Sequence, residues 1–191
     1  MKITKTFFDD SIKLIEITQH HDQRGYFSVS YNRVDFKKIN INDKFTQDNY
    51  SFSKNKNTLR GIHYQYKPYE QSKLINVIHG SIFDVFVDLR LDSKTYGQFR
   101  STIINSNNII LYIPAGFGHA ICTLEKNTLV HYKVSNKYSP KNEETIIWDD
   151  PDLRVKWPKF STNIILSDKD RKGITLKDFE FKIKRSLWWD I

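Results

Sequence analysis

The chain has 191 residues, of which 39% are hydrophobic and 14% aromatic, and its formal net charge at pH 7 is +8. This size fits one ordinary domain with a single hydrophobic core, and the composition excludes a disordered or fibrous protein. The positive charge suits an anionic partner such as a phosphate-bearing molecule, although solvated surface lysines would give the same total.

The N-terminal segment and the single cysteine both bear on the compartment. Asp9 and Asp10 stand where a signal peptide needs an apolar stretch, and no apolar run approaches membrane-spanning length. Cys122 has no second cysteine to pair with, so we expect a small buried residue. The chain also has no basic run or zinc-ligand spacing typical of nucleic-acid binding. We expect a cytoplasmic protein with neither a membrane nor a nucleic-acid partner.

Short strand-like runs separated by turn signals follow one another along the chain, most of them alternating or rich in β-branched residues. In chain order they cover residues 12–18, 25–31, 73–90, 99–105, 108–114, 128–135 and 144–150. Helical periodicity is poor except in residues 33–40 and 167–181, which predict short peripheral helices. The pattern predicts a mainly β, antiparallel sandwich or barrel. We expect one domain over residues 1–191, with 172–191 as a C-terminal tail.

The run at residues 81–89 alternates strictly, and its two acids fall on one strand face. Asp84 and Asp88 share that face with Ile82 and Phe86. On this period alone, the simpler interpretation is a solvent-exposed outer face. The alternative is that Asp84 points into a polar cavity inside a barrel.

Two histidines stand in segments suited to chemistry. The segment LRGIHYQ places Gly61, His63 and Gln65 on one strand face with Arg60 beside them, and the glycines and proline of IPAGFGHA predict a turn just before His119. A barrel that holds a metal usually presents several imidazoles and a carboxylate, often beginning with His-x-His. Because the second imidazole is missing here, we expect no metal, and proton transfer is the better use of these histidines. Taken alone, each histidine is weak evidence, because a lone histidine is more often structural.

The motifs around the two histidines favour a catalytic over a structural role when they are taken together. In these segments the sequence resembles the dTDP-4-dehydrorhamnose 3,5-epimerase family, a metal-free branch of the cupin-like barrels. Similar segments run in order through residues 20–172: RGYF, FTQDNYS, LRGIHYQ, QSKLINVIHGSIFDVFVDLR, IPAGFGHA, YKVSNKYSP, WDDP, VKWP and LSDKD. Linked motifs in a fixed order are far more specific than any single one. The resemblance implies a cupin-like antiparallel β-barrel, or jelly roll, that works without a cofactor and as a homodimer.

The resemblance also implies an activity and the residues that perform it. The substrate would be dTDP-4-dehydro-6-deoxy-D-glucose, inverted at C3 and C5 to give the L-rhamnose precursor for surface polysaccharide. His63 would accept the proton, oriented by Asp170, and Tyr132 would donate one. Lys73 and His119 would contact the sugar, Arg24 and Arg60 the diphosphate, and Gln47 and Asn49 the nucleoside. Tyr138 would stack on the base, and Glu143 and Lys169 would also line the substrate site.

These residue types suit that chemistry. A ketone at C4 acidifies the hydrogens on both neighbouring carbons by spreading charge into an enolate. A histidine beside a carboxylate can remove such a proton near neutral pH, and a tyrosine can return one to the opposite ring face. Lys73 is the natural partner for the enolate oxygen, because a preorganised cation acts best where charge develops.

One position departs from the family pattern. Two residues beyond the Phe of RGYF the family usually has Glu, and this chain has Val29, so the base or the sugar could differ. The alternatives are a C3-only epimerase, an epimerase for another nucleotide-linked 4-keto sugar such as a deoxyheptose, and a non-catalytic sugar-nucleotide-binding barrel. The presence of base, acid and orienting carboxylate speaks against the last. Asp84 stays open between a second partner for His63 and an interior residue satisfied by backbone.

Overall fold

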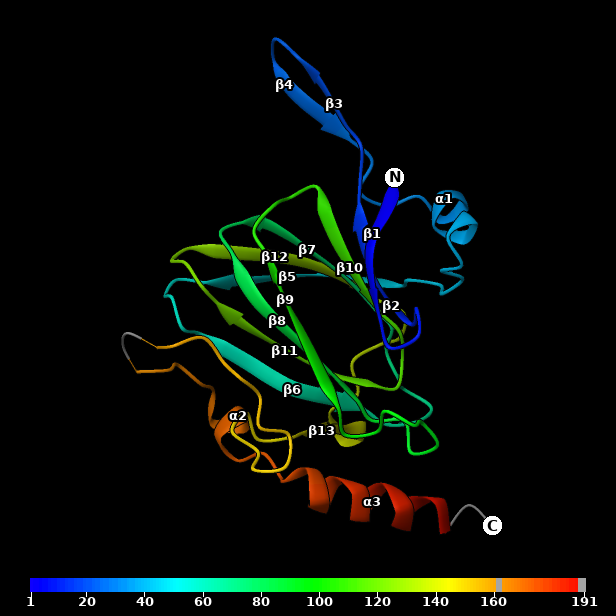
Figure 1. The fold of residues 1–191 in the computed structure, drawn as a ribbon, viewed down its shortest axis with the longest axis vertical. Coiled ribbons are helices and arrows are strands. Elements are labelled where there is room, and N and C mark those ends of the chain that lie inside the picture. The colour runs from blue at the N-terminus through cyan, green and yellow to red at the C-terminus, as the bar shows by residue number, and fades with distance from the viewer. Residues whose placement is uncertain (161–162, 189–191) are drawn as a thin grey trace.

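The computed structural model describes residues 1–160 and 163–188, and its named strands pair antiparallel in two large sheets and one hairpin (Figure 1). The six-stranded sheet has the order β1 (Lys2–Phe7), β2 (Ile12–Glu16), β10 (Ile109–Ile113), β7 (Lys73–His79), β12 (Thr128–Val134) and β5 (Gln47–Ser53). The five-stranded sheet has the order β13 (Glu143–Thr145), β6 (Leu59–Gln65), β11 (Phe117–Thr123), β8 (Ile82–Asp88) and β9 (Phe99–Ile104). The mainly β, antiparallel architecture predicted from the sequence is confirmed.

The remaining elements lie at the periphery. Strands β3 (Gln19–Asp22) and β4 (Gly25–Ser28) form a hairpin that projects away from both sheets (Figure 1). The helices are α1 (Arg33–Lys38), α2 (Asp168–Arg171) and α3 (Leu176–Trp188), with a 3-10 turn at Pro140–Asn142. The helices fall in or next to the segments predicted for them. No helix in the described part of the chain is long and apolar enough to cross a membrane.

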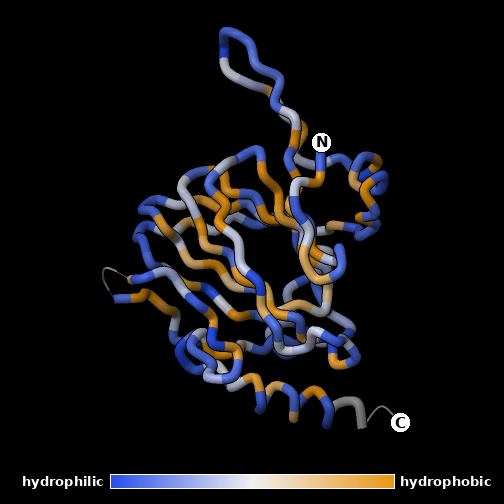
Figure 2. The backbone as a smooth tube through the Cα atoms, in the orientation of Figure 1, coloured by the Kyte–Doolittle hydropathy of each residue, from blue (hydrophilic) through white to orange (hydrophobic). Residues whose placement is uncertain are grey.

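Three apolar clusters hold these layers together, and Figure 2 shows the apolar positions spread along the strands of both sheets. The first lies between the sheets and includes Ile75, Phe86 and Leu111. The second covers the other face of the five-stranded sheet, where Val85 packs in one cluster with Phe179 of α3. The third joins the six-stranded sheet to α1 and the loop after it.

This layering corrects the prediction for residues 81–89. Ile82 and Phe86 belong to the cluster between the sheets, whereas Val85 and Val87 belong to the cluster beneath α3. Both faces of β8 are therefore buried, and Asp84 is 0% exposed. The solvent-exposed interpretation is wrong because the face that carries Asp84 points toward the facing sheet, while the C-terminal segment covers the opposite face of β8. The alternative is confirmed in that Asp84 points toward the interior.

Two further sequence expectations are corrected. Residues 144–150 were predicted as a strand, but β13 ends at Thr145, and a turn follows in which the buried carboxylate of Asp150 accepts hydrogen bonds from the backbone N–H groups of Asp152, Leu153 and Leu176. Gly118, predicted in a turn, lies inside β11, where a Cβ atom would come within 2.9 Å of side-chain carbons of Ile62 and Leu89.

The predicted run 73–90 is two strands that belong to different sheets. The chain crosses between the sheets at Gly80, whose φ of +84° is unfavourable for residues with a side chain. A Cβ atom there would lie 2.4 Å from Oγ1 of Thr128. Glycine is therefore required at this crossing.

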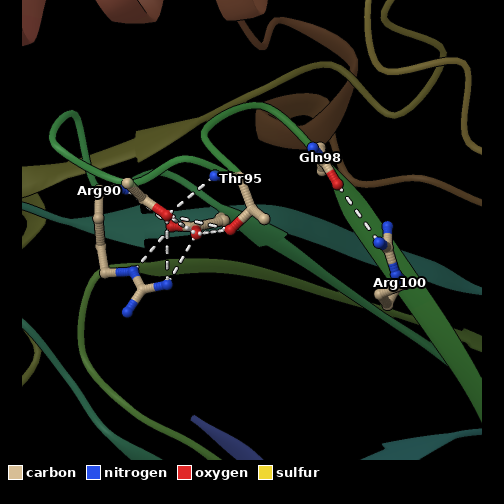
Figure 3. A network of polar contacts seen from close by, with 6 residues as sticks. Arg90, Thr95, Gln98 and Arg100 are labelled. Atoms are coloured by element: carbon tan, nitrogen blue, oxygen red, sulfur yellow. Dashed lines mark hydrogen bonds and ion pairs between the residues drawn. The ribbon is translucent and has the colours of Figure 1, made fainter. Parts of the chain in front are cut away.

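A buried carboxylate fixes the loop between β8 and β9 (Figure 3). Asp88 is 0% exposed and accepts hydrogen bonds from Arg90, Ser93 and Thr95. The guanidinium carbon of Arg90 lies 4.5 Å from the ring centroid of Phe117, the first residue of β11. The network thus supports the strand that carries His119.

Candidate active site

A short polar contact joins His63 of β6 to Asp170 of α2. Nε2 of His63 lies 2.6 Å from Oδ1 of Asp170, and Asp170 is 3% exposed. Burial opposes the ionised form of this carboxyl, but the hydrogen bonds with His63 and Ser167 outweigh it and lower the pKa of Asp170. An ionised carboxylate in hydrogen-bond contact with Nε2 holds the imidazole ring of His63 in a fixed orientation.

An irregularity in β6 brings Arg60 and His63 to the same cavity. In the pairing with β11, His63 stands opposite His119 and Arg60 opposite Ile121, so β6 uses one residue more than its partner. Such a bulge reverses the alternation of faces beyond it. Gly61 lies within it, where a Cβ atom would be 2.5 Å from the carbonyl oxygen of His119. Strict alternation, as predicted, would have set Arg60 and His63 on opposite faces.

A second histidine–carboxylate pair lies on the neighbouring strands. Nε2 of His119 lies 3.0 Å and 3.1 Å from the two carboxylate oxygens of Asp84. Burial raises the pKa of Asp84 and lowers that of His119, so burial disfavours the charged form of each. The partner of Asp84 is thus His119, and neither of the two alternatives left open by the sequence holds.

Lys73 and Tyr132 come from the facing, six-stranded sheet. Lys73 begins β7, and burial lowers its pKa to about 8. Tyr132 lies in β12, and burial raises its pKa. The two sheets therefore present His63 and Tyr132 to the space between them from opposite sides.

Two adjoining cavities, of about 400 and 380 Å³, occupy that space and share His63, Lys73, Tyr132 and Lys169. The first is also lined by Gln47, Asn49, Tyr138 and Glu143, and the second by Arg60, His119 and Asp170. The structure thus brings together all the predicted site residues except Arg24.

The outer rim of the first cavity is a hydrogen-bonded group of three side chains. Tyr138, 52% exposed, donates from its hydroxyl to Oε2 of Glu143 over 2.7 Å. Lys169 forms an ion pair with the same carboxylate and lies 5.9 Å from the centroid of the Tyr138 ring. An exposed ring held in this way offers a flat face for stacking.

Arg24 lies outside both cavities. It occupies the turn between β3 and β4, its side chain is 84% exposed, and it pairs with Asp22 of its own hairpin. Val29, just beyond β4, is 51% exposed. A single chain therefore does not bring the hairpin residues to the site.

Sequence reasoning missed two supporting contacts. Gln65 lines the first cavity and anchors the loop that carries Tyr138, because its side chain bonds to the carbonyl of Lys137 and accepts from the backbone N–H of Ser139. Ser167 is the N-cap of α2, and its hydroxyl also donates to the carboxylate of Asp170. The spacing Ser-x-x-Asp was the only signal for this contact.

The site can move protons. Among the described residues, no three or more His, Cys, Asp or Glu side chains gather in a way that could hold a metal ion. The cavities instead combine a histidine–carboxylate base, a buried cation and a tyrosine hydroxyl. This set suits the removal and return of a proton at carbon, with the developing negative charge stabilised by the cation.

Sequence comparison places the chain in one family. The sequence model of the family described as dTDP-4-dehydrorhamnose 3,5-epimerase matches residues 9–178. A curated protein of that name from Sinorhizobium fredii is 40% identical over 160 residues, which are 83% of this chain and 82% of the relative.

Two solved structures are similar over nearly their whole length. A dTDP-4-dehydrorhamnose 3,5-epimerase from Bacillus anthracis with TDP and PPi bound is 43% identical, with a TM-score of 0.87 over 92% of this chain and 99% of its own. A dTDP-6-deoxy-D-glucose-3,5-epimerase from Legionella pneumophila in complex with dTDP-4-keto-L-rhamnose is 37% identical, with a TM-score of 0.86 over 92% and 93%. These similarities confirm the predicted cupin-like jelly roll.

Proposed function

The chain belongs to the dTDP-4-dehydrorhamnose 3,5-epimerase family and is an isomerase of that type, and we propose that it inverts both C3 and C5 of dTDP-4-dehydro-6-deoxy-D-glucose. The relatives reported above are named for inversion at both carbons. Neither inversion at C3 alone nor a purely binding role is favoured by them.

One observation supports the catalytic assignment best: a histidine of one sheet, paired with an aspartate of α2, faces a tyrosine of the other sheet across a shared cavity. His63 takes the proton from the carbon beside the ketone, and Asp170 stabilises the imidazolium that forms. Tyr132 returns a proton to the opposite face of the ring. His63 then loses its proton to solvent and Tyr132 regains one from it, which restores both groups for the next carbon.

Lys73 stabilises the enolate oxygen in this proposal. Its side chain is in both cavities, between the sheets that carry His63 and Tyr132. His119, oriented by Asp84, contacts the sugar from the neighbouring strand. One well-placed donor of this kind contributes on the order of 3 kcal/mol to transition-state stabilisation.

The nucleotide takes the outer parts of the cavities. Gln47 and Asn49, hydrogen-bonded to each other over 2.7 Å, contact the nucleoside, and Tyr138 stacks on the base beside Glu143 and Lys169. Arg60 contacts the diphosphate, because a guanidinium offers a planar fork of donors to phosphate oxygens.

We also propose that the enzyme is a cytoplasmic homodimer. The projecting hairpin exposes Tyr26, Phe27 and Val29 together with Arg24, an apolar surface unusual for an isolated chain. For Arg24 to contact the diphosphate, as the family resemblance implies, the hairpin must reach the cavity of a second copy. The buried thiol of Cys122 needs no oxidising compartment.

Epimerisation in deuterated water tests the function. Purified protein incubated with dTDP-4-dehydro-6-deoxy-D-glucose should introduce deuterium at both C3 and C5, detected by mass spectrometry and NMR. Label at C3 alone would show single inversion, and no label with any dTDP- or GDP-linked 4-keto sugar would favour a binding protein. His63→Asn should abolish the exchange at both carbons.

A further inference from the structure

The carboxylate that partners the proposed base is held on both oxygens. Oδ1 of Asp170 faces Nε2 of His63 at 2.6 Å and accepts from the backbone N–H of Gly61 at 3.4 Å. Oδ2 accepts from the hydroxyl of Ser167 over 2.7 Å. The same hydroxyl oxygen accepts from the backbone N–H of Asp170 over 3.1 Å. Its single proton is therefore directed at the carboxylate.

We propose that Ser167 is a positioning residue for proton transfer, which holds Asp170 in place and tunes the basicity of His63 through it. This inference rests on the proposed function, in which His63 is the base. Ser167 lines the second cavity with His63 and Asp170, so the three side chains form one connected chain of contacts at the site.

The direction of the effect follows from where the charge lies. A hydroxyl that donates to a carboxylate stabilises its negative charge and withdraws part of it from the oxygen facing His63. Without this donor, Asp170 would stabilise the imidazolium of His63 more strongly, and the coupled pair would bind its proton at higher pH. A base must be unprotonated to act, so activity would then be lost at a higher pH on the acid side.

Helix capping is the competing explanation. Ser167 is the N-cap of α2, and loss of a cap alone could disturb Asp170. Glycine at an N-cap costs only a few tenths of a kcal/mol relative to serine, and threonine keeps both the cap and the hydroxyl. Ser167→Gly and Ser167→Thr therefore separate the donor from the cap.

Other charged and titratable groups face the pair and are the same in every variant. In the second cavity they are Tyr50 of β5, Arg60 of β6, Lys73 of β7, His119 of β11, Tyr132 of β12 and Lys169 of α2, and the first cavity adds Tyr138 and Glu143. Differences between variants in the pH profile thus report on the hydroxyl of Ser167.

The test compares the pH dependence of kcat/KM for the wild type, Ser167→Gly and Ser167→Thr. We expect the acid limb of Ser167→Gly to move to higher pH by about half to one unit, roughly a three- to tenfold loss of kcat/KM below the limb, with Ser167→Thr unshifted. Coincident limbs for wild type and Ser167→Gly, or an equal shift in Ser167→Thr, would overturn the proposal.

A titration of the His63 imidazole by NMR gives an answer that is independent of turnover. The pKa of His63 should be higher in Ser167→Gly than in the wild type and unchanged in Ser167→Thr. If the wild type turns over no sugar nucleotide, the proposed function fails, while this titration still decides whether Ser167 acts on His63 through Asp170.

Discussion

Lys73 is a partly buried cation whose charge depends on pH near neutrality. Burial lowers its pKa to about 8, although the nearby carboxylates of Asp84 and Glu143 oppose this. A lysine with a lowered pKa is charged below that value and neutral above it, so the stabilisation of the enolate should be lost as the pH rises through about 8. The pH dependence of kcat/KM should show this alkaline limb.

Replacing Lys73 tests the same assignment. Lys73→Met should lower kcat by about 10²- to 10³-fold, the usual cost of one oxyanion donor, and should remove the limb near pH 8 from the residual activity. Tyr132, whose pKa burial raises, titrates at higher pH and leaves this limb unaffected. An unchanged alkaline limb in Lys73→Met would rule out Lys73 as its source.

Tyr132 has the most specific role in the proposal, since only the return of the proton depends on it. Tyr132→Phe should keep substrate affinity but reduce inversion by about 10²- to 10⁴-fold, while His63 still exchanges the substrate's own hydrogen with solvent. Calorimetry and deuterium washout measure the two effects. Tyr96→Phe is the matched control, because Tyr96 is a largely buried tyrosine that lines neither cavity. An equal loss of binding in Tyr132→Phe would contradict the donor role.

Individual residues also show what the sequence can predict. The motifs identified His63 and Asp170 as partners although 107 positions separate them in the chain, and the structure places them 2.6 Å apart. Asp84 was harder, because alternation tells which residues share a strand face but not what covers that face. The facing six-stranded sheet covers the face with Asp84, and α3, near the other end of the chain, covers the opposite face.

At the scale of elements, the loop after β8 owes its shape to Asp88. Burial opposes its ionised form, but hydrogen bonds from Arg90, Ser93 and Thr95 outweigh burial and lower the pKa of Asp88 to about 2. A carboxyl with a lowered pKa stabilises the fold above its unfolded value of about 4. This contribution, about 2 kcal/mol, should be lost as the pH falls from about 4 towards 2.

Asp88→Asn should therefore lower the free energy of unfolding by about 2 kcal/mol at pH 7, measured by urea denaturation. The variant should also lose less stability than the wild type between pH 4 and 2. Asp92→Asn, an exposed acid in the same loop, serves as the control and should change neither value. Equal acid sensitivity in the wild type and Asp88→Asn would contradict this role.

The strand elements were predicted unevenly for physical reasons. The runs that became β2, β7, β8, β10 and β12 are rich in β-branched residues and were recognised. Strand β5, QDNYSFS, was not, because its residues are mostly polar. The bulge at Gly61 follows from the close approach of His119, a tertiary contact that local sequence does not reveal.

For the whole molecule, the projecting hairpin is the feature that one chain leaves unexplained. It carries Arg24, assigned to the diphosphate by resemblance, yet it projects away from both sheets (Figure 1), and Arg24 lines neither cavity of its own chain. The protein should be a dimer by light scattering.

Arg24→Ala should raise KM about tenfold or more while kcat changes little, because the arginine contributes a charge-assisted hydrogen bond to bound substrate.

Co-expression of two differently tagged defective chains can show whether the site is shared. Arg24→Ala keeps the base but lacks the arginine, and His63→Asn keeps the arginine but lacks the base. If the hairpin serves the partner's cavity, each mixed dimer regains one complete site. With random pairing, about a quarter of all sites then contain both His63 and Arg24. Purified mixed dimers should then turn over substrate with the wild-type KM. A KM equal to that of Arg24→Ala alone would show that each chain uses its own hairpin or none.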